Sequence, residues 1–166
     1  MKNLNNRVLL ITLFLVIAAL LRLIPHPPNF VPITAIAIFS GAKFTNIKYA
    51  LSIPLIIMLI SDIFIGFYSI SLFVYLAFII ITIYNFLRKK YTIINVFASS
   101  LLFFMISNLG VWILGGYGYT FEGLLLCYTM AIPFFVNAIA ADMFYSTILF
   151  FGFKKAEKRL ISVTKN

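Results

Sequence analysis

The chain has 166 residues, of which 63% are hydrophobic and 10% are charged, and its mean hydropathy is +1.09. Soluble domains carry about a quarter charged residues, so this composition excludes a soluble domain and indicates a single integral membrane domain over residues 1–166. The net charge of +9 does not indicate nucleic-acid binding. The basic residues stand singly or in short clusters between apolar runs, as topology signals do.

A helix that spans the bilayer needs about 20 mostly apolar residues. The first candidate, 8–24, follows two basic residues and is interpreted as a retained span, because no convincing small-x-small cleavage site is present. The second, 30–42, is short for a full crossing, so we expect tilt or local thinning of the bilayer. The next three candidates are 49–67, 71–87 and 93–114.

The apolar run from Leu124 to Phe153 is too long for one straight crossing. Pro133 lies inside it, and proline removes a backbone donor and kinks or ends a helix. We therefore expect Pro133 to separate an interfacial helix, 121–132, from a sixth span, 134–153.

The basic residues test this count of spans. With a cytoplasmic N-terminus and six crossings, 12 of the 13 lysines and arginines fall on the cytoplasmic side, and Arg22 alone falls on the other. The positive-inside rule favours such a separation. We therefore expect an all-α bundle of six transmembrane helices in a bacterial inner membrane, with both termini in the cytoplasm.

The three outward connections hold most of the unusual side chains. Polar residues at membrane depth are costly and normally face a cavity or a partner. Their convergence predicts an outward-opening pocket for a small polar or aromatic ligand, in which Arg22 and Asp62 share a polar cluster and Trp112 stacks on the ligand one turn above Asn108. The candidate binding residues are Arg22, His26, Asn29, Asp62, Tyr68, Asn108, Trp112, Asn137 and Asp142.

Each of these residues also has a purely structural interpretation. Arg22 and Asp62 could form a structural ion pair, and asparagines commonly link helices in membrane bundles by hydrogen bonds. Trp112 matches an aromatic residue of the membrane interface. These alternatives stay open on the sequence alone.

No motif of covalent chemistry is present. The sequence has no glycine-rich phosphate loop with a lysine, no HExxH or Cys-His metal spacing and no GxSxG nucleophile elbow. We therefore expect a protein that is not an enzyme, with no catalytic residues, metal or cofactor. Any energy for transport would come from an ion gradient or from a partner subunit.

Four stretches resemble an uncharacterised bacterial family of membrane transport proteins: RLIPHPPNFVPITAIAIFSGA, LISDIFIGFY, ISNLGVWILGGYGYT and GLLLCYTMAIPFFVNAIAADMFYSTILF. That family is similar to the substrate-binding S components of energy-coupling-factor (ECF) vitamin transporters. The resemblance implies six helices, cytoplasmic termini and an outer pocket for a vitamin-type molecule. It also implies a partner, a transmembrane coupling subunit with ATPases, which releases the cargo.

The chain departs from S components in one respect. They often carry an Ala-x-x-x-Ala docking motif on the first helix, which is absent here, and Ala37 with Gly41 on the second span is a candidate substitute. The alternative function is a membrane scaffold without a ligand, similar to the rod-shape protein MreD in length and number of spans. A scaffold requires no outer pocket, so the polar residues of the outward side favour transport.

Overall fold

The computed structural model describes residues 9, 13, 16, 20 and 27–163. Within 27–163 it consists of five helices: α2 (Ile33–Lys43), α3 (Ile47–Ile65), α4 (Ser71–Arg88), α5 (Ile93–Ile113) and α6 (Phe121–Val163). The four helices α3 to α6 are long and apolar enough to cross a membrane. These residues therefore confirm the prediction of an all-α membrane protein.

The bounds of α3, α4 and α5 lie within two residues of the predicted spans 49–67, 71–87 and 93–114. Side-chain caps explain two of the starts: Asn46 accepts a hydrogen bond from the Lys48 N–H at 2.9 Å, and Thr92 accepts one from the Asn95 N–H at 3.1 Å. Such caps satisfy amides that have no partner inside the helix. The predicted span 8–24 lies outside the described residues apart from four exposed helical positions, Leu9, Leu13, Val16 and Leu20.

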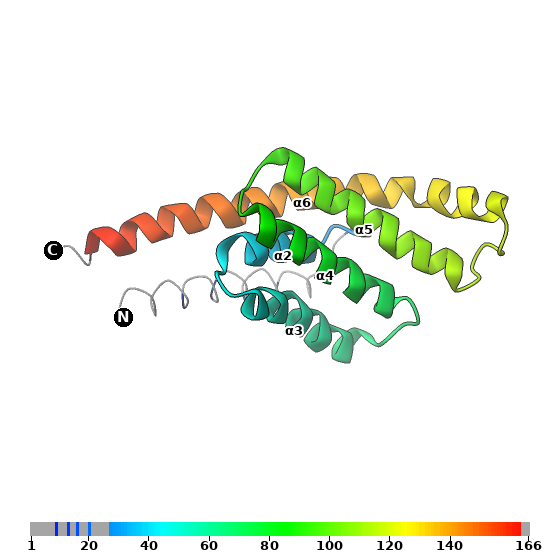
Figure 1. The fold of residues 1–166 in the computed structure, drawn as a ribbon, viewed down its shortest axis with the longest axis horizontal. Coiled ribbons are helices and arrows are strands. Elements are labelled where there is room, and N and C mark those ends of the chain that lie inside the picture. Colours follow the sequence, from blue (N-terminus) through cyan, green and yellow to red (C-terminus); the bar gives the residue numbers. More distant parts are fainter. Residues whose placement is uncertain (1–8, 10–12, 14–15, 17–19, 21–26, 164–166) are drawn as a thin grey trace.

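Helix α2 is the centre of the bundle (Figure 1). Nine of its eleven residues, Ile33 to Gly41, are buried, and it contacts α3, α4, α5 and α6. At 1.5 Å per residue it is about 16 Å long, roughly half of the 30 Å hydrocarbon layer. The short second span is therefore a half-length helix enclosed by protein, which explains its length without bilayer thinning.

The end of α2 is packed closely on α4. A Cβ added at Gly41 would lie 2.5 Å from the Thr82 carbonyl oxygen, so only glycine fits. The Lys89 ammonium donates to the carbonyl of Gly41 at 3.1 Å and also to that of Phe44, where a cation complements the helix dipole. Ala37 and Gly41 are buried inside the chain, so this candidate docking pair is not accessible to a coupling subunit.

Helix α6 is continuous from Phe121 to Val163 and includes Pro133. The predicted division into an interfacial helix, 121–132, and a span, 134–153, is therefore wrong for this structure. Proline is tolerated within membrane helices, where breaking the helix would leave further backbone groups without partners in lipid. The 43 residues of α6 extend over about 64 Å, and its C-terminal part runs on past the neighbouring helices (Figure 1).

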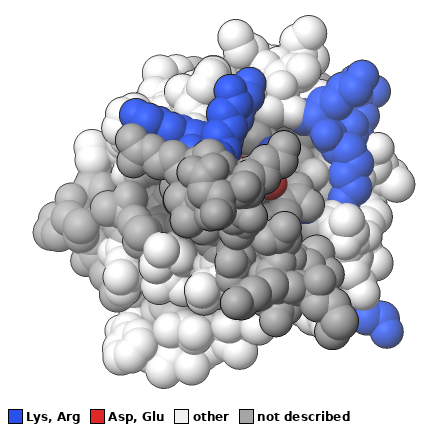
Figure 2. All heavy atoms as spheres, turned by 90° about the vertical axis from the view of Figure 1, so that its left-hand side faces the viewer, with Lys and Arg blue, Asp and Glu red and all other residues white. Residues whose placement is uncertain are grey.

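The lysines and arginines of the described chain gather at one end of the bundle. The end that holds the α2–α3 and α4–α5 connections and the last part of α6 carries the lysines and arginines, which appear in blue in Figure 2. The opposite end carries Glu122 and no lysine or arginine among the described residues. The cations with described side chains are Lys43, Lys48, Arg88, Lys89, Lys90, Lys154, Lys155 and Lys158.

Candidate functional site

A tight turn directly precedes α2. It lies in the half of the bundle that the short helix α2 does not reach. The Phe30 N–H donates to the Pro27 carbonyl at 3.0 Å, and Asn29 has a left-handed φ of 60°. This is the pattern of a type II turn, which favours proline at the second position and glycine or asparagine at the third. The sequence Pro27-Pro28-Asn29-Phe30 therefore specifies the turn directly.

The turn is fixed to α6. The Asn137 side-chain amide donates to the Pro28 carbonyl at 3.2 Å, and the Phe30 ring packs against Tyr145 and Phe144, with ring centroids 5.7 and 6.3 Å apart. Asn137 is thus a link between helix and turn, which is the structural interpretation that the sequence left open.

Two cavities lie beside Asn29, because α2 does not extend into this half of the bundle. One has a volume of about 200 Å³ and lies between α4, α5 and α6. The other has a volume of about 270 Å³ and reaches α3 and the first residue of α2. Both are lined by Asn29, Val74 and Phe103, so they adjoin at these residues.

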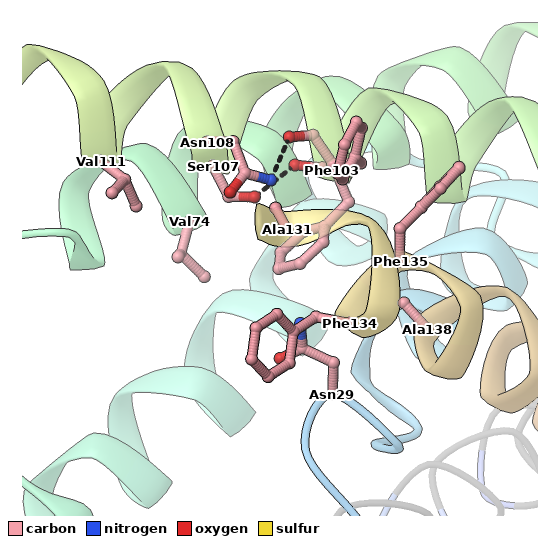
Figure 3. Close-up of a pocket in the computed structure, with 11 residues that line it drawn as sticks. Asn29, Val74, Phe103, Ser107, Asn108, Val111, Ala131, Phe134, Phe135 and Ala138 are labelled. Atoms are coloured by element: carbon pink, nitrogen blue, oxygen red, sulfur yellow. Dashed lines mark hydrogen bonds between the residues drawn. The ribbon is translucent and has the colours of Figure 1, made fainter. Parts of the chain in front are cut away.

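The first cavity combines aromatic walls with a few polar groups. Figure 3 shows Asn29 and Phe134 across from Ser107 and Asn108, which project from α5. Ser107 donates its hydroxyl proton to the Phe103 carbonyl at 2.7 Å, and the Asn108 amide donates to the Phe104 carbonyl at 2.8 Å. The Asn108 amide oxygen and the Ser107 lone pairs remain available as acceptors.

The described lining of these cavities contains no charged side chain. It consists of aliphatic and aromatic groups with three polar residues, which is the usual composition of a site for a small organic molecule. Within the described residues, no group of three or more histidine, cysteine or acidic side chains is placed to hold a metal ion.

Asp142 lies just below the cavities in the middle of α6. Its carboxylate is 2% exposed, accepts a hydrogen bond from Ser100 on α5 at 2.7 Å and is also hydrogen-bonded by Thr34 in the first turn of α2. Ala138, one turn away on α6, lines the first cavity. Asp142 therefore connects three helices at the floor of the cavity region.

Asp62 occupies a separate position near the end of α3. It is 5% exposed and accepts a hydrogen bond from the Tyr75 hydroxyl on α4 at 2.9 Å. It is not among the residues that line the two cavities. The predicted pairing with Arg22 cannot be followed, because Arg22 and His26 lie outside the described residues.

Two further predicted residues lie away from the cavities. Trp112 packs edge-on against Tyr119, with ring centroids 6.4 Å apart, and its indole N–H is buried without a hydrogen-bond partner among the described residues. Val111, its neighbour on α5, lines the cavity instead. Tyr68 lies in the α3–α4 connection and is 63% exposed.

The structure thus brings Asn29 and Asn108 together at one cavity, with Asn137 and Asp142 beside it. Sequence reasoning missed Ser107, Ser100 and Thr34, as well as the aromatic wall. Ser107 adjoins Asn108 in the sequence, which was a usable signal. Serine and threonine are common in apolar helices, where they bond to their own backbone, so Ser100 and Thr34 gave none. The aromatic wall consists of Phe103, Phe104, Phe134 and Phe135.

Comparison with known proteins identifies a family but no characterised relative. Residues 2–163 match the model of DUF6580, which is described as a family of unknown function. No curated protein and no solved structure matches the chain. Since the match covers nearly all of the sequence, the chain belongs to the DUF6580 family.

Proposed function

We propose that this protein is the substrate-binding subunit of a membrane transporter and takes up a small molecule through the cavity region beside Asn29. The observation that carries the proposal is the half-length helix α2. It leaves the other half of the bundle to a turn and two adjoining cavities, which are lined by aromatic rings and amide groups. A bundle that served only as a scaffold would gain stability by filling this space.

The orientation of the protein follows from its charges. The described lysines and arginines gather at the end of the bundle opposite the cavities (Figure 2). The positive-inside rule places such an end in the cytoplasm, so the cavities open toward the outside of a bacterial inner membrane. This orientation agrees with six spans and two cytoplasmic termini.

The cavity lining favours a neutral, flat ligand. Phenylalanine rings offer stacking surfaces, while Asn29, Ser107 and Asn108 supply hydrogen bonds without a formal charge. The individual volumes of about 200 and 270 Å³ lie below the usual range of roughly 300–1,000 Å³ for ligand sites. A ligand of one or two rings is therefore the expected size, and a vitamin-type molecule falls in this class.

Energy for uptake would come from a partner, as the resemblance to ECF S components implies. In such a complex a transmembrane coupling subunit with ATPases binds the S component. Since Ala37 and Gly41 are buried inside the chain, docking would use another surface. The exposed C-terminal part of α6 is a candidate, because it extends past the bundle at the basic end (Figure 1).

The test is a search for a bound molecule followed by affinity measurements. Native mass spectrometry of the gently purified protein should show a co-purified small molecule. Asn29→Gly keeps the left-handed backbone and removes the amide, so it should weaken binding of that compound by roughly 3- to 10-fold, the value of one hydrogen bond. Thr129→Ala is the matched control, because Thr129 is exposed on α6 and bonds only its own helix at Leu125.

A second pair of variants tests the aromatic wall. Phe104→Ala should weaken binding by removing a ring that stacks on Phe135 at 4.5 Å and lines the cavity. Trp112→Ala should leave the affinity unchanged. If no molecule binds the native protein, the scaffold alternative is favoured. If Trp112→Ala weakens binding more than Phe104→Ala, the assignment of the cavity is wrong.

A further inference from the structure

Asp142 is a buried carboxylate without a cationic partner in the described chain. It is 2% exposed, and its hydrogen bonds come from the hydroxyls of Ser100 and Thr34. A carboxylate left charged in a low-dielectric interior is costly unless it is paired or neutralised. Hydroxyl groups orient such a carboxylate, but they do not neutralise it.

Among the described helices, those packed against Asp142 offer little that could balance its charge. Helix α5 contains no titratable residue between 93 and 113. The titratable residue of α2 is Lys43 at its far end, nine residues from Thr34 and therefore about 14 Å away along the helix. On α6 itself, the nearby titratable residue is Tyr145, whose ring packs against Phe30.

The hydrogen bonds of Ser100 allow two protonation states of Asp142. The Ser100 Oγ lies 2.7 Å from the Asp142 Oδ2 and 3.1 Å from the Val96 carbonyl oxygen. A hydroxyl has one proton to donate and two lone pairs to accept with. With an ionised Asp142, Ser100 donates to the carboxylate. With a neutral Asp142, Ser100 donates to the Val96 carbonyl and accepts a hydrogen bond from the carboxyl O–H of Asp142.

A further polar group, the hydroxyl of Ser146, lies near Asp142 and Ser100. The Ser146 hydroxyl is fully buried and has no hydrogen-bond partner among the described residues. It follows Asp142 by four residues, so it lies on the same face of α6, about 6 Å away along the helix. Buried polar groups in proteins are nearly always hydrogen-bonded, so an orphan calls for an explanation. A water molecule that enters beside Asp142 would give the Ser146 hydroxyl a partner and would also deliver a proton to the carboxylate.

We propose that Asp142 is a proton-binding site that takes up and releases one proton from the side of the cavities. The step forms one O–H bond on the Asp142 carboxylate with a proton delivered by water. The Ser100 hydroxyl then turns from the Asp142 Oδ2 to the Val96 carbonyl, and release reverses both changes. Ala138 lines the first cavity and lies one helical turn from Asp142. Ile33 lines the second cavity and adjoins Thr34 in the sequence. The path for a proton from either cavity to Asp142 is therefore short.

This site deepens the proposed function and rests on it in one respect, the coupling of the proton to ligand uptake. In that case the energy for uptake would come from a proton gradient, the other source that the sequence leaves open, and not from a partner ATPase. Proton binding itself requires no ligand. It can therefore be tested even if the search for a bound small molecule fails.

The chain offers a simple spectroscopic test, because Asp62 and Asp142 are its two aspartates. Protein labelled with ¹³C at the aspartate side-chain carboxyl should give two carboxyl resonances in detergent micelles. Asp62→Asn and Asp142→Asn each remove one of them, so either variant alone assigns both. We expect the Asp142 resonance to move reversibly between its ionised and neutral positions as the pH is changed.

Two variants separate proton binding from a merely structural role. Ser100→Ala should shift the midpoint of this titration by about tenfold in proton concentration, since it removes a hydrogen bond to a charged group. Ser52→Ala, at an exposed hydroxyl that bonds its own helix at Lys48, should leave the midpoint unchanged.

Two results would overturn the proposal. An Asp142 resonance that stays at one position over the whole pH range in which the protein is folded would show a fixed charge or a fixed neutral acid. A resonance that follows the sodium concentration at constant pH would show a metal-ion site instead of a proton site.

Discussion

Gly41 is the position where the enclosed half-helix touches its neighbour most closely, and its replacement by alanine is the sharpest test of this packing. A Cβ at residue 41 would lie 2.5 Å from the Thr82 carbonyl oxygen and 3.0 Å from the Phe86 nitrogen. Both atoms belong to the α4 backbone, so a change of side-chain rotamer cannot relieve the contact. Ordinary contacts of this kind begin at 3.4 Å, and α2 and α4 must separate to reach it.

Two opposing effects set the size of the change. Alanine is a better helix former than glycine by about 1 kcal/mol. Inserting a methyl group into a tightly packed interior costs about 1–3 kcal/mol, and contacts with rigid backbone favour the upper part of this range. We therefore expect Gly41→Ala to lower the free energy of unfolding by about 1–2 kcal/mol.

The assay is reversible unfolding in mixed micelles, compared with a matched glycine variant. Gly116→Ala is the control, because its new Cβ would meet no atom closer than 3.5 Å, and its stability should change by less than about 0.5 kcal/mol. A Gly41→Ala protein as stable as the native one would refute the close approach of α2 and α4.

Two further predictions concern the basic end and the topology. Lys89→Met should lower the free energy of unfolding by about 1 kcal/mol, since it removes the ammonium that donates to the carbonyls at the end of α2. Lys90→Met is the control and should leave the stability unchanged, because Lys90 is exposed and its side chain makes no hydrogen bond within the described chain. In a Cys127→Ser background, an impermeant thiol reagent applied to intact cells should label a cysteine at position 119 and not one at position 90. The reverse labelling pattern would contradict the proposed orientation.

The sequence predicted those parts of the fold that depend on the length of an apolar run. Less than a third of the apolar stretch of α3, α4 and α5 is buried inside the chain, as in helices that face lipid, so the length of each apolar run matches the length of its helix. Hydropathy does not show whether an apolar helix is surrounded by lipid or by protein. For this reason the sequence of α2 predicted a short transmembrane span. The small residues of its sequence, Ala35, Ala37, Ser40 and Gly41, were the signal of a helix enclosed by others.

The candidate site was predicted in part for a similar reason. Depth along each helix can be counted from the sequence, and it correctly indicated that Asp62, Asn108 and Asp142 need a protein environment. The direction around the helix axis cannot be fixed with the same accuracy. The side chains of Asn108 and Trp112 differ in direction by about 40° around the axis of α5, because four residues of a helix with 3.6 residues per turn advance slightly past one turn. In the structure Val111 occupies the cavity wall and Trp112 lies beside it.

One local feature accounts for the position of both proposed sites. Helix α2 begins after Pro32, and the type II turn before it reverses the chain beside Asn29 instead of extending the helix. The cavities therefore lie beyond the start of α2, and Asp142 lies where that start meets α5 and α6. The amides of the first turn of a helix carry partial positive charge, which lessens the cost of a negative Asp142 but does not remove it, since the described residues place no cation beside the carboxylate. A carboxylate that is held by hydroxyl groups can be neutralised by a proton without breaking an ion pair, which makes this junction suited to reversible protonation beside a ligand cavity.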